Sequence, residues 1–192
     1  MKPIVLASSS PRRKELLEKI GLKFIIDPSE EEESLDYRSA PRKLAKSLSL
    51  EKARAAAVRH PSSIIIAADT FGVLGDKLLG KPADTQQARD MLKMMSGNKH
   101  TVITGFTVLD ASSGRSITEA VETEVYFRKL GLDEIDAYIR SGEPMDKAGA
   151  YAIQGLGAIL VEKIEGDYYN VVGLPLAALA RVLKKFDIDL LK

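Results

Sequence analysis

One carboxylate of this sequence directly follows its most apolar segment. Asp69 and Thr70 come after residues 64–68, a run of three isoleucines and two alanines. The run predicts a buried strand that stops at Asp69, and in open α/β sheets ligands collect at the carboxyl ends of strands. There, Asp69 could bind a divalent metal ion or accept a proton from an attacking water. The alternative is an aspartate that only begins a turn, the commoner role of such a residue taken alone.

The loop after the first apolar run combines hydroxyls and cations that suit an anion. The pattern predicts a strand over residues 4–7 and a helix that begins at Pro11, with Ser10 at the N-cap. Arginines in the first helical turn oppose the helix dipole, so a negative group is expected nearby, and a phosphate fits the N–H groups there. The candidate residues are Ser8, Ser10, Arg12 and Arg13. The alternative is a serine that only caps the helix and arginines that point into solvent.

Two lysines occupy positions that are unusual for surface lysines. Lys52 falls on the inward apolar stripe of a helix predicted over residues 41–59, where an ammonium needs an anion or must extend to solvent. Extension to solvent is the commoner outcome. Lys81 follows a hairpin and ends a near match to a phosphate-binding P-loop. However, the next residue is Pro82, which has neither a metal-binding hydroxyl nor an N–H, so a P-loop kinase or ATPase is excluded.

Other ionisable residues give weaker signals. Residues 30–33 are four consecutive glutamates, usually a solvated loop, but one of them could share a metal ion with Asp69. The sequence does not determine which one. His60 and His100 lack metal-ligand spacing and form no convincing triad, so both are expected to be structural.

The elements that must position these residues alternate between strands and helices. Continuous apolar runs are typical of strands covered on both faces, and a 3.6-residue period indicates a helix. Strands are predicted at residues 4–7, 24–26 and 64–68, with hairpins about residues 75–76, 112–114 and 165–166. Helices are predicted over 11–20 and 41–59, after Asp84 as a cap with Gln87, over 133–140, and from Pro175. The last hairpin pairs residues 158–163 with 168–172. This order predicts an α/β fold with a mixed sheet.

Composition limits the classes of protein. A chain of 192 residues, 45% of them hydrophobic, can bury a core, so one domain over residues 1–192 is expected, with two lobes as an open alternative. Its 28 basic and 27 acidic residues give a net charge of +1, so nucleic acid is not the expected partner. The absence of cysteine excludes a disulfide scaffold and a cysteine nucleophile. Because no apolar run is long enough for a signal peptide or a membrane span, the cytoplasm is the expected location.

Several ordered motifs together resemble one protein family. They are LASSSPRR at residues 6–13, EKA at 51–53, ADT at 68–70, GKP at 80–82, DKAGAYAIQG at 146–155 and GDYYNVVGLP at 166–175. Each motif is weak alone, but the ordered set covers nearly the whole chain and is highly specific. On these residues the sequence resembles the Maf family of nucleoside triphosphate pyrophosphatases.

The resemblance implies an elongated α/β mixed-sheet fold with a deep central cleft, similar to the ITPase-like pyrophosphatases. It also implies a divalent metal cation, Mg or Mn, as cofactor, a nucleoside triphosphate as substrate, and a homodimer. On the family's pattern Asp69 accepts the proton and binds the metal together with Glu33. Arg12, Arg13, Lys52 and Lys81 match positions that hold phosphates. Arg12, Thr70 and Gln154 match positions associated with substrate choice. The implied catalytic residues are Asp69, Lys81, Lys52 and Glu33, and the implied substrate-binding residues are Ser8, Ser10, Arg12, Arg13, Thr70 and Gln154.

The stretch around Gln154 looks like the branch that acts on dTTP and UTP, rather than the branch that acts on 7-methyl-GTP. An amide offers both a donor and an acceptor, as the edge of uracil or thymine requires. The implied reaction is hydrolysis of dTTP, UTP or modified pyrimidine nucleotides to the monophosphate and pyrophosphate. Two alternatives stay open. One is a pyrophosphatase for non-standard purine nucleotides, and the other is a nucleotide-responsive regulatory binding module linked to septum formation.

Overall fold

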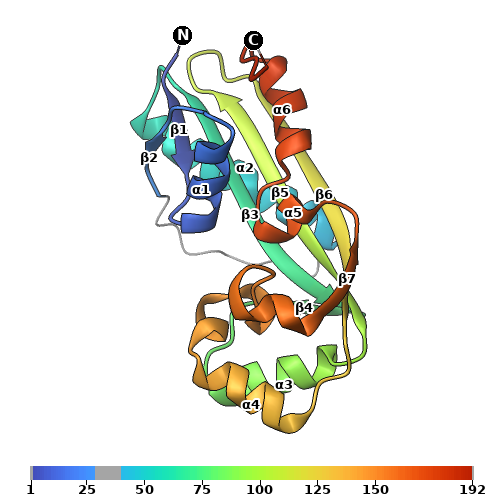
Figure 1. Ribbon diagram of the computed structural model, residues 1–192. Helices are drawn as coiled ribbons and strands as arrows, with labels where there is room; N and C mark the ends of the chain where they lie inside the picture. Colours follow the sequence, from blue (N-terminus) through green and yellow to red (C-terminus); the bar gives the residue numbers. More distant parts are fainter. Residues whose placement is uncertain (1, 29–39, 192) are drawn as a thin grey trace. The chain divides into compact units, whose positions relative to one another are not determined.

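The protein is a mixed α/β structure, as the sequence predicts. The computed structural model describes residues 2–28 and 40–191 (Figure 1). Within these residues, a seven-stranded sheet has the order β2-β1-β3-β5-β6-β7, and β4 pairs with β3. The strands are β1 (Ile4–Ala7), β2 (Ile25–Ile26), β3 (Ile64–Leu74), β4 (Lys77–Leu79), β5 (Lys99–Asp110), β6 (Ser116–Phe127) and β7 (Val161–Glu165). The α-helices are α1 (Pro11–Lys19), α2 (Pro41–Arg59), α3 (Thr85–Met95), α4 (Leu132–Arg140), α5 (Tyr168–Val172) and α6 (Leu176–Lys184). Three 3-10 helices are η1 (Glu143–Asp146), η2 (Ala148–Ala150) and η3 (Gly155–Leu160).

The chain divides into two compact units. The first unit comprises Met1–Asp69, Thr104–Val121 and Gly173–Lys192, and the second comprises Thr70–Ile103 and Glu122–Val172. Strands β3, β5 and β6 each contribute residues to both units. The expected cleft and the choice between one domain and two lobes stay predictions.

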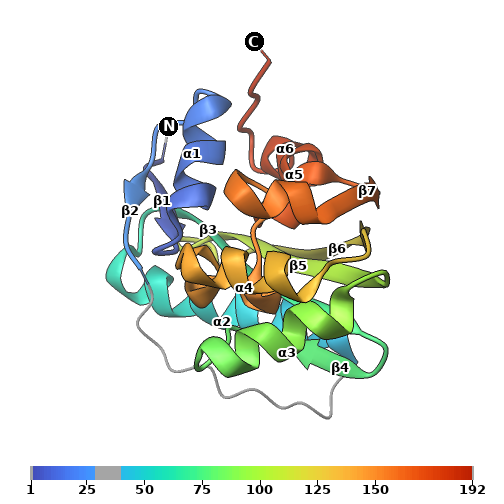
Figure 2. The ribbon, with the colours of Figure 1, turned by 60° about the horizontal axis from the view of Figure 1, so that its bottom comes forward.

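The first unit is built on parallel strands, of which β1 and the start of β3 are buried while β2 is exposed. β1 pairs in parallel with β2 and with β3, in a register that places Ile4 beside Ile64 and Ala7 beside Ala67. Both views place α1 and α2 on opposite faces of these strands, which explains why β1 and the start of β3 are apolar throughout (Figures 1 and 2). Close packing of α2 on β5 requires Gly105, because a Cβ there would lie 2.0 Å from the carbonyl oxygen of Ala45.

The predicted end of the central strand at Asp69 is wrong. β3 continues to Leu74, so Asp69 lies inside the strand. The continuation is stabilised by antiparallel pairing with β4, which joins Leu74 to Lys77 across a turn with Gly75 at a φ of 58°. The neighbouring strand β1 nevertheless ends at Ala7, so Asp69 lies beyond the end of its parallel neighbour.

The second unit packs two helices around an apolar core. α3 and α4 lie side by side in both views, and their buried faces include Met95 and Ile135 (Figure 2). The predicted cap of α3 is confirmed, because the carboxylate of Asp84 accepts a hydrogen bond from the Gln87 backbone N–H at 2.7 Å. The Gln87 side chain in turn accepts from the N–H of Ala83, which satisfies a second N–H group at this end of the helix.

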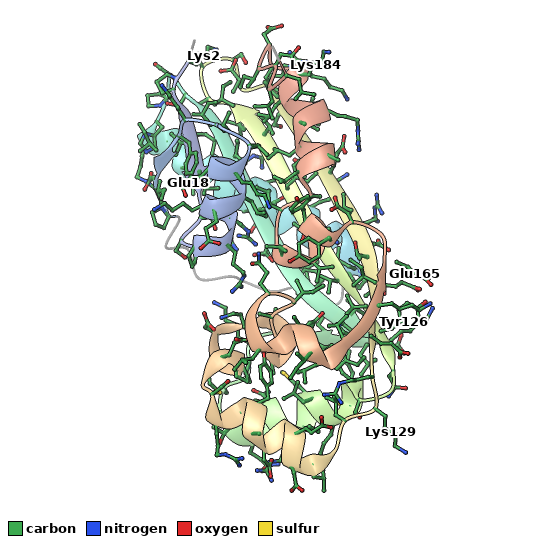
Figure 3. The ribbon with its side chains drawn as sticks, viewed as in Figure 1. Lys2, Glu18, Tyr126, Lys129, Glu165 and Lys184 are labelled. Atoms are coloured by element: carbon green, nitrogen blue, oxygen red, sulfur yellow. The ribbon has the colours of Figure 1, made fainter. Side chains whose placement is uncertain are left out.

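The predicted hairpin of residues 158–163 with 168–172 is wrong, because the second of these segments is helix α5. The Asp167 carboxylate accepts from the N–H groups of Tyr169 and Asn170, and this local capping favours helix over strand. β7 pairs instead with β6, with Glu165 opposite Glu124. Figure 3 shows Tyr126 and Glu165 together at this edge, where the Tyr126 hydroxyl donates to the Glu165 carboxylate at 2.9 Å.

His100 is a buried, uncharged side chain of the second unit. It is 3% exposed, its Nε2 lies 2.9 Å from the Tyr151 hydroxyl, and its ring meets Phe127 edge-on. Burial lowers the pKa of His100 from 6.5 to about 4. The unfolded chain therefore binds a proton that the folded chain excludes between these two values, and stability falls as the pH decreases through this window.

We expect His100→Gln to be less sensitive to acid than the wild type. Between pH 7.5 and pH 4.5 the histidine should contribute about 2 to 3 kcal/mol of the wild-type loss in free energy of unfolding. Urea denaturation at the two pH values measures this difference in each protein. Equal losses in wild type and variant would contradict the assignment of His100 as the titrating group.

Candidate functional site

The carboxylate of Asp69 forms an ion pair with Lys52. Lys52 lies on α2, whose neighbouring Ala53 and Ala56 are buried against the parallel strands, and this packing turns the lysine toward β3. The Lys52 ammonium binds Asp69 Oδ1, and the two side chains are only 16% and 10% exposed. The sequence left open whether the Lys52 ammonium pairs with an anion or extends to solvent. In the structure it pairs with the Asp69 carboxylate. The pair places a protected carboxylate beside a cation: the carboxylate can bind a metal ion or accept a proton, and the cation can bind phosphate.

Arg13 holds three segments of the first unit together around Asp69. Its Nη1 donates to the Ser8 hydroxyl at 3.0 Å and to the Ala68 carbonyl at 2.7 Å. Its Nε donates to the carbonyl of Gly173 at 3.0 Å. Because β1 ends at Ala7, the Ala68 carbonyl lies beyond the β1–β3 pairing and receives the guanidinium instead of a strand N–H. Arg13 thus fixes the backbone immediately before Asp69, a role that the sequence did not indicate. Its expected contact with phosphate stays a prediction.

The loop from Ser8 to α1 is arranged by local hydrogen bonds. The Ser8 hydroxyl is buried and also accepts from the Ser10 backbone N–H at 3.2 Å. Ser10 is at the N-cap with Pro11 behind it, as predicted, but its hydroxyl makes no capping hydrogen bond. Arg12 is half-buried and pairs with none of the described residues. The Ser10 hydroxyl and the Arg12 guanidinium therefore fit the expected anion site, because both could donate hydrogen bonds to the oxygens of a bound anion.

Three predicted site residues belong to the second unit. Thr70 follows Asp69 directly and is half-buried, while Lys81 is exposed just after β4. The loop before Lys81 is fixed by a hydrogen bond of 2.9 Å from the Gly149 N–H to the Gly80 carbonyl. Gln154 is half-buried and precedes η3 with an extended backbone. Neither the Lys81 ammonium nor the Gln154 amide has a partner among the described residues, so both are available for a ligand.

Asp69 and Glu33 are the residues expected to hold the metal ion. Glu33, like residues 30–32, lies outside the described residues. Among those described, no group of three or more His, Cys, Asp or Glu side chains could hold a metal ion. Magnesium, however, is usually bound by one or two carboxylates together with substrate phosphates. Lys52 binds Oδ1 of Asp69, and Oδ2 is a second anionic oxygen of the kind that binds magnesium. The residues present therefore fit a metal that is shared with the substrate.

Glu143 contacts the segment after Gln154, which no motif of the sequence indicated. This residue of η1 accepts hydrogen bonds from the backbone N–H groups of Leu156 and Gly157, two and three positions after Gln154. Gly155 and Gly157 could have indicated such a contact, because glycine often occurs where the backbone packs closely against other groups.

No helix of the described residues combines the length and apolar character that crossing a bilayer requires. The longest, α2, carries charged residues along its whole length.

Comparison with known proteins connects these residues to a family. A family model described as Maf-like protein matches residues 3–186. A protein of Methanosarcina barkeri is 49% identical over 99% of this chain and 97% of its own length, and one of Alkaliphilus metalliredigens is 50% identical over the full length of both. Both of these relatives are named dTTP/UTP pyrophosphatase. The solved structure of a HAM1 protein from Coxiella burnetii has a TM-score of 0.55 at 16% identity, covering 96% of this chain and all of that one, which shows a shared fold. The chain therefore belongs to the Maf family, as its ordered motifs indicate.

Proposed function

We propose that this protein hydrolyses dTTP and UTP to the monophosphate and pyrophosphate. The observation that carries the proposal is the protected Asp69–Lys52 pair, which lies within the residues that match the Maf-like family model. Full-length relatives at 49% and 50% identity, both named for this activity, support the choice of substrate. Because such nucleotides are cytoplasmic metabolites, the cytoplasm is the proposed location.

In the proposed reaction, a water oxygen attacks the α-phosphorus and the bond from that phosphorus to the bridging oxygen breaks. Asp69 accepts the proton of the water, and pyrophosphate leaves with the bridging oxygen. Lys52 stays beside the carboxylate and holds it in place through the ion pair. The Ala68 carbonyl and the Ser8 hydroxyl keep Arg13 fixed, so this part of β3 is arranged before the substrate arrives.

A divalent cation, magnesium or manganese, is proposed as the cofactor. Asp69, with Glu33 as the second expected ligand, would hold it together with the phosphate oxygens. When bound, such an ion neutralises charge that develops on the phosphates and orients the triphosphate. Arg12 and Lys81, which lack partners among the described residues, would contact the remaining phosphate oxygens.

Lys81→Ala is expected to lower kcat/KM for UTP by about tenfold to a hundredfold. The variant loses a charge-assisted contact to phosphate, and such contacts contribute about 1.5 to 3 kcal/mol. Lys77→Ala is a matched control, because Lys77 is an exposed lysine of β4 in the same unit. Steady-state kinetics of the two variants measure the difference. An effect of Lys81→Ala below threefold, similar to that of the control, would mean that Lys81 is an ordinary surface lysine.

The position of attack can be tested with UTP in water enriched in ¹⁸O. We expect UMP and pyrophosphate in equal amounts, with the heavy oxygen in the phosphate of UMP. Label in pyrophosphate would show attack at the β-phosphorus, and UDP with inorganic phosphate would show cleavage of a different bond. Either result would overturn the proposed reaction.

A further inference from the structure

A network of hydrogen bonds, ranging from buried to exposed, surrounds the backbone on both sides of Gln154. On one side, the Ala152 N–H donates to the Tyr138 hydroxyl at 3.3 Å. On the other, the N–H groups of Leu156 and Gly157 donate to Glu143 at 3.0 and 2.9 Å. The Tyr138 hydroxyl completes the network by donating to Glu143 Oε1 at 2.8 Å. Hydrogen bonds therefore fix the backbone of this segment both before and after Gln154.

Steric constraints show how closely this network fits the segment. Gly155 has a φ of 80°, and a Cβ there would lie 2.6 Å from Glu143 Oε2. A Cβ at Gly157 would lie 2.3 Å from the Ala152 carbonyl and 2.6 Å from the Tyr138 hydroxyl. At Gly157 a side chain would collide with the backbone of Ala152, and at Gly155 the positive φ strains any other residue, so both positions favour glycine. The backbone on the C-terminal side of Gln154 thus packs closely against Glu143 and Tyr138.

The charge state of the pair suits this role. Partial burial of Glu143 opposes its ionisation, but the hydrogen bonds from Gly157, Tyr138 and Leu156 outweigh burial and keep the pKa of Glu143 below its ordinary value. Burial, together with the bond to Glu143, raises the pKa of Tyr138, so its hydroxyl remains a donor at neutral pH. The network is complete under physiological conditions.

We propose that Glu143 is a positioning residue for nucleobase selection, acting through Gln154. The inference rests on the proposed function and deepens it, because it assigns to Glu143 and Tyr138 the fixed backbone that carries the base-reading amide. Hydrogen bonds that read a base discriminate only when their donor and acceptor are held in place. Glu143 itself is bonded to the protein through both carboxylate oxygens, so it acts on the amide indirectly.

Three variants test the proposal. Glu143→Ala removes all three acceptor contacts, and Tyr138→Phe removes the hydroxyl that joins Ala152 to Glu143. Glu143→Gln is the conservative variant, because an amide oxygen at the Oε1 position can still accept from Gly157 and Tyr138. Glu162→Ala, at an exposed glutamate of β7 in the same unit, serves as the control.

Kinetics with UTP and ATP separate positioning from general stability. In Glu143→Ala we expect the ratio of kcat/KM for UTP over ATP to fall at least about tenfold through a higher KM for UTP, with kcat changed by less than about twofold. Tyr138→Phe and Glu143→Gln should show smaller falls, and Glu162→Ala none. A merely structural role would lower the active fraction, and hence kcat, equally for both nucleotides. An unchanged ratio in all three variants overturns the proposal, whatever their melting temperatures.

Binding measurements keep this test separate from the test of the proposed function. The α,β-methylene analogues of UTP and ATP cannot be cleaved at the relevant bond, and calorimetry gives their affinities without turnover. If the wild type fails to hydrolyse UTP, the proposed function fails. If the wild type prefers the UTP analogue and Glu143→Ala keeps the same preference, the positioning role fails independently.

Discussion

Replacing Asp69 by asparagine is expected to lower kcat for UTP by about 10² to 10⁴-fold, the usual contribution of a positioned general base. Asparagine has nearly the same size, but its amide neither accepts a proton at neutral pH nor balances the charge of Lys52. The same change removes a carboxylate that is proposed as a metal ligand. Turnover of UTP with magnesium measures the loss.

Asp76→Asn is the matched control for this experiment. Asp76 is exposed in the turn between β3 and β4, a few residues further along the same chain segment. Its replacement should leave kcat unchanged. Circular dichroism of both variants establishes that they are folded. An Asp69→Asn protein that is folded and turns over UTP at the wild-type rate would remove Asp69 from the mechanism.

Arg13→Ala is expected to lower the free energy of unfolding by about 3 kcal/mol, which corresponds to a melting temperature roughly 6 to 12 °C lower. Hydrogen bonds made by charged groups contribute about 1.5 to 3 kcal/mol each and do not add in full. The variant leaves the carbonyls of Ala68 and Gly173 and the hydroxyl of Ser8 without the guanidinium. Activity should fall as well, because Ala68 immediately precedes Asp69.

Arg13→Lys should recover only part of this stability. An ammonium is a compact donor and cannot reproduce the spread of Nη1 and Nε across three acceptors. Lys14→Ala, at an exposed neighbour on α1, is expected to change stability by less than about 0.5 kcal/mol. Thermal unfolding compares the three proteins. Full stability in Arg13→Lys would mean that the charge alone, and not the geometry of the guanidinium, stabilises this region.

Most helices could be predicted from periodicity and caps. α2 has the bounds that the sequence predicts, from Pro41 to Arg59, because its apolar stripe and its terminal proline are local signals. The two errors arose where a distant or side-chain partner decides the structure. β3 extends past Asp69 because β4 pairs with it, and residues 168–172 are helical because Asp167 caps them.

The sequence suggested which residues form the site, but it did not reveal all the contacts that the structure gives them. The position of Lys52 on an apolar face indicated that it needed an anion, yet nothing in the sequence identifies Asp69, seventeen positions away, as that anion. The acceptors of Arg13 at Ala68 and Gly173 are backbone carbonyls, which every residue has, so no pattern of residue types could reveal them. The role of Glu143 depends likewise on backbone N–H groups. Glu33 as a ligand, the homodimer and the lack of nucleic acid binding stay predictions.

The most direct test of the central claim is a comparison of specificity constants for the wild-type protein with magnesium. The panel contains dTTP, UTP, 7-methyl-GTP and non-standard purine triphosphates, and the assay measures pyrophosphate together with the nucleoside monophosphate. We expect dTTP and UTP to give the highest kcat/KM, with monophosphate and pyrophosphate formed in equal amounts. Preference for a non-standard purine triphosphate would contradict the proposed substrate. Tight retention of nucleotide without turnover of any compound would contradict the enzymatic function and favour a regulatory binding module.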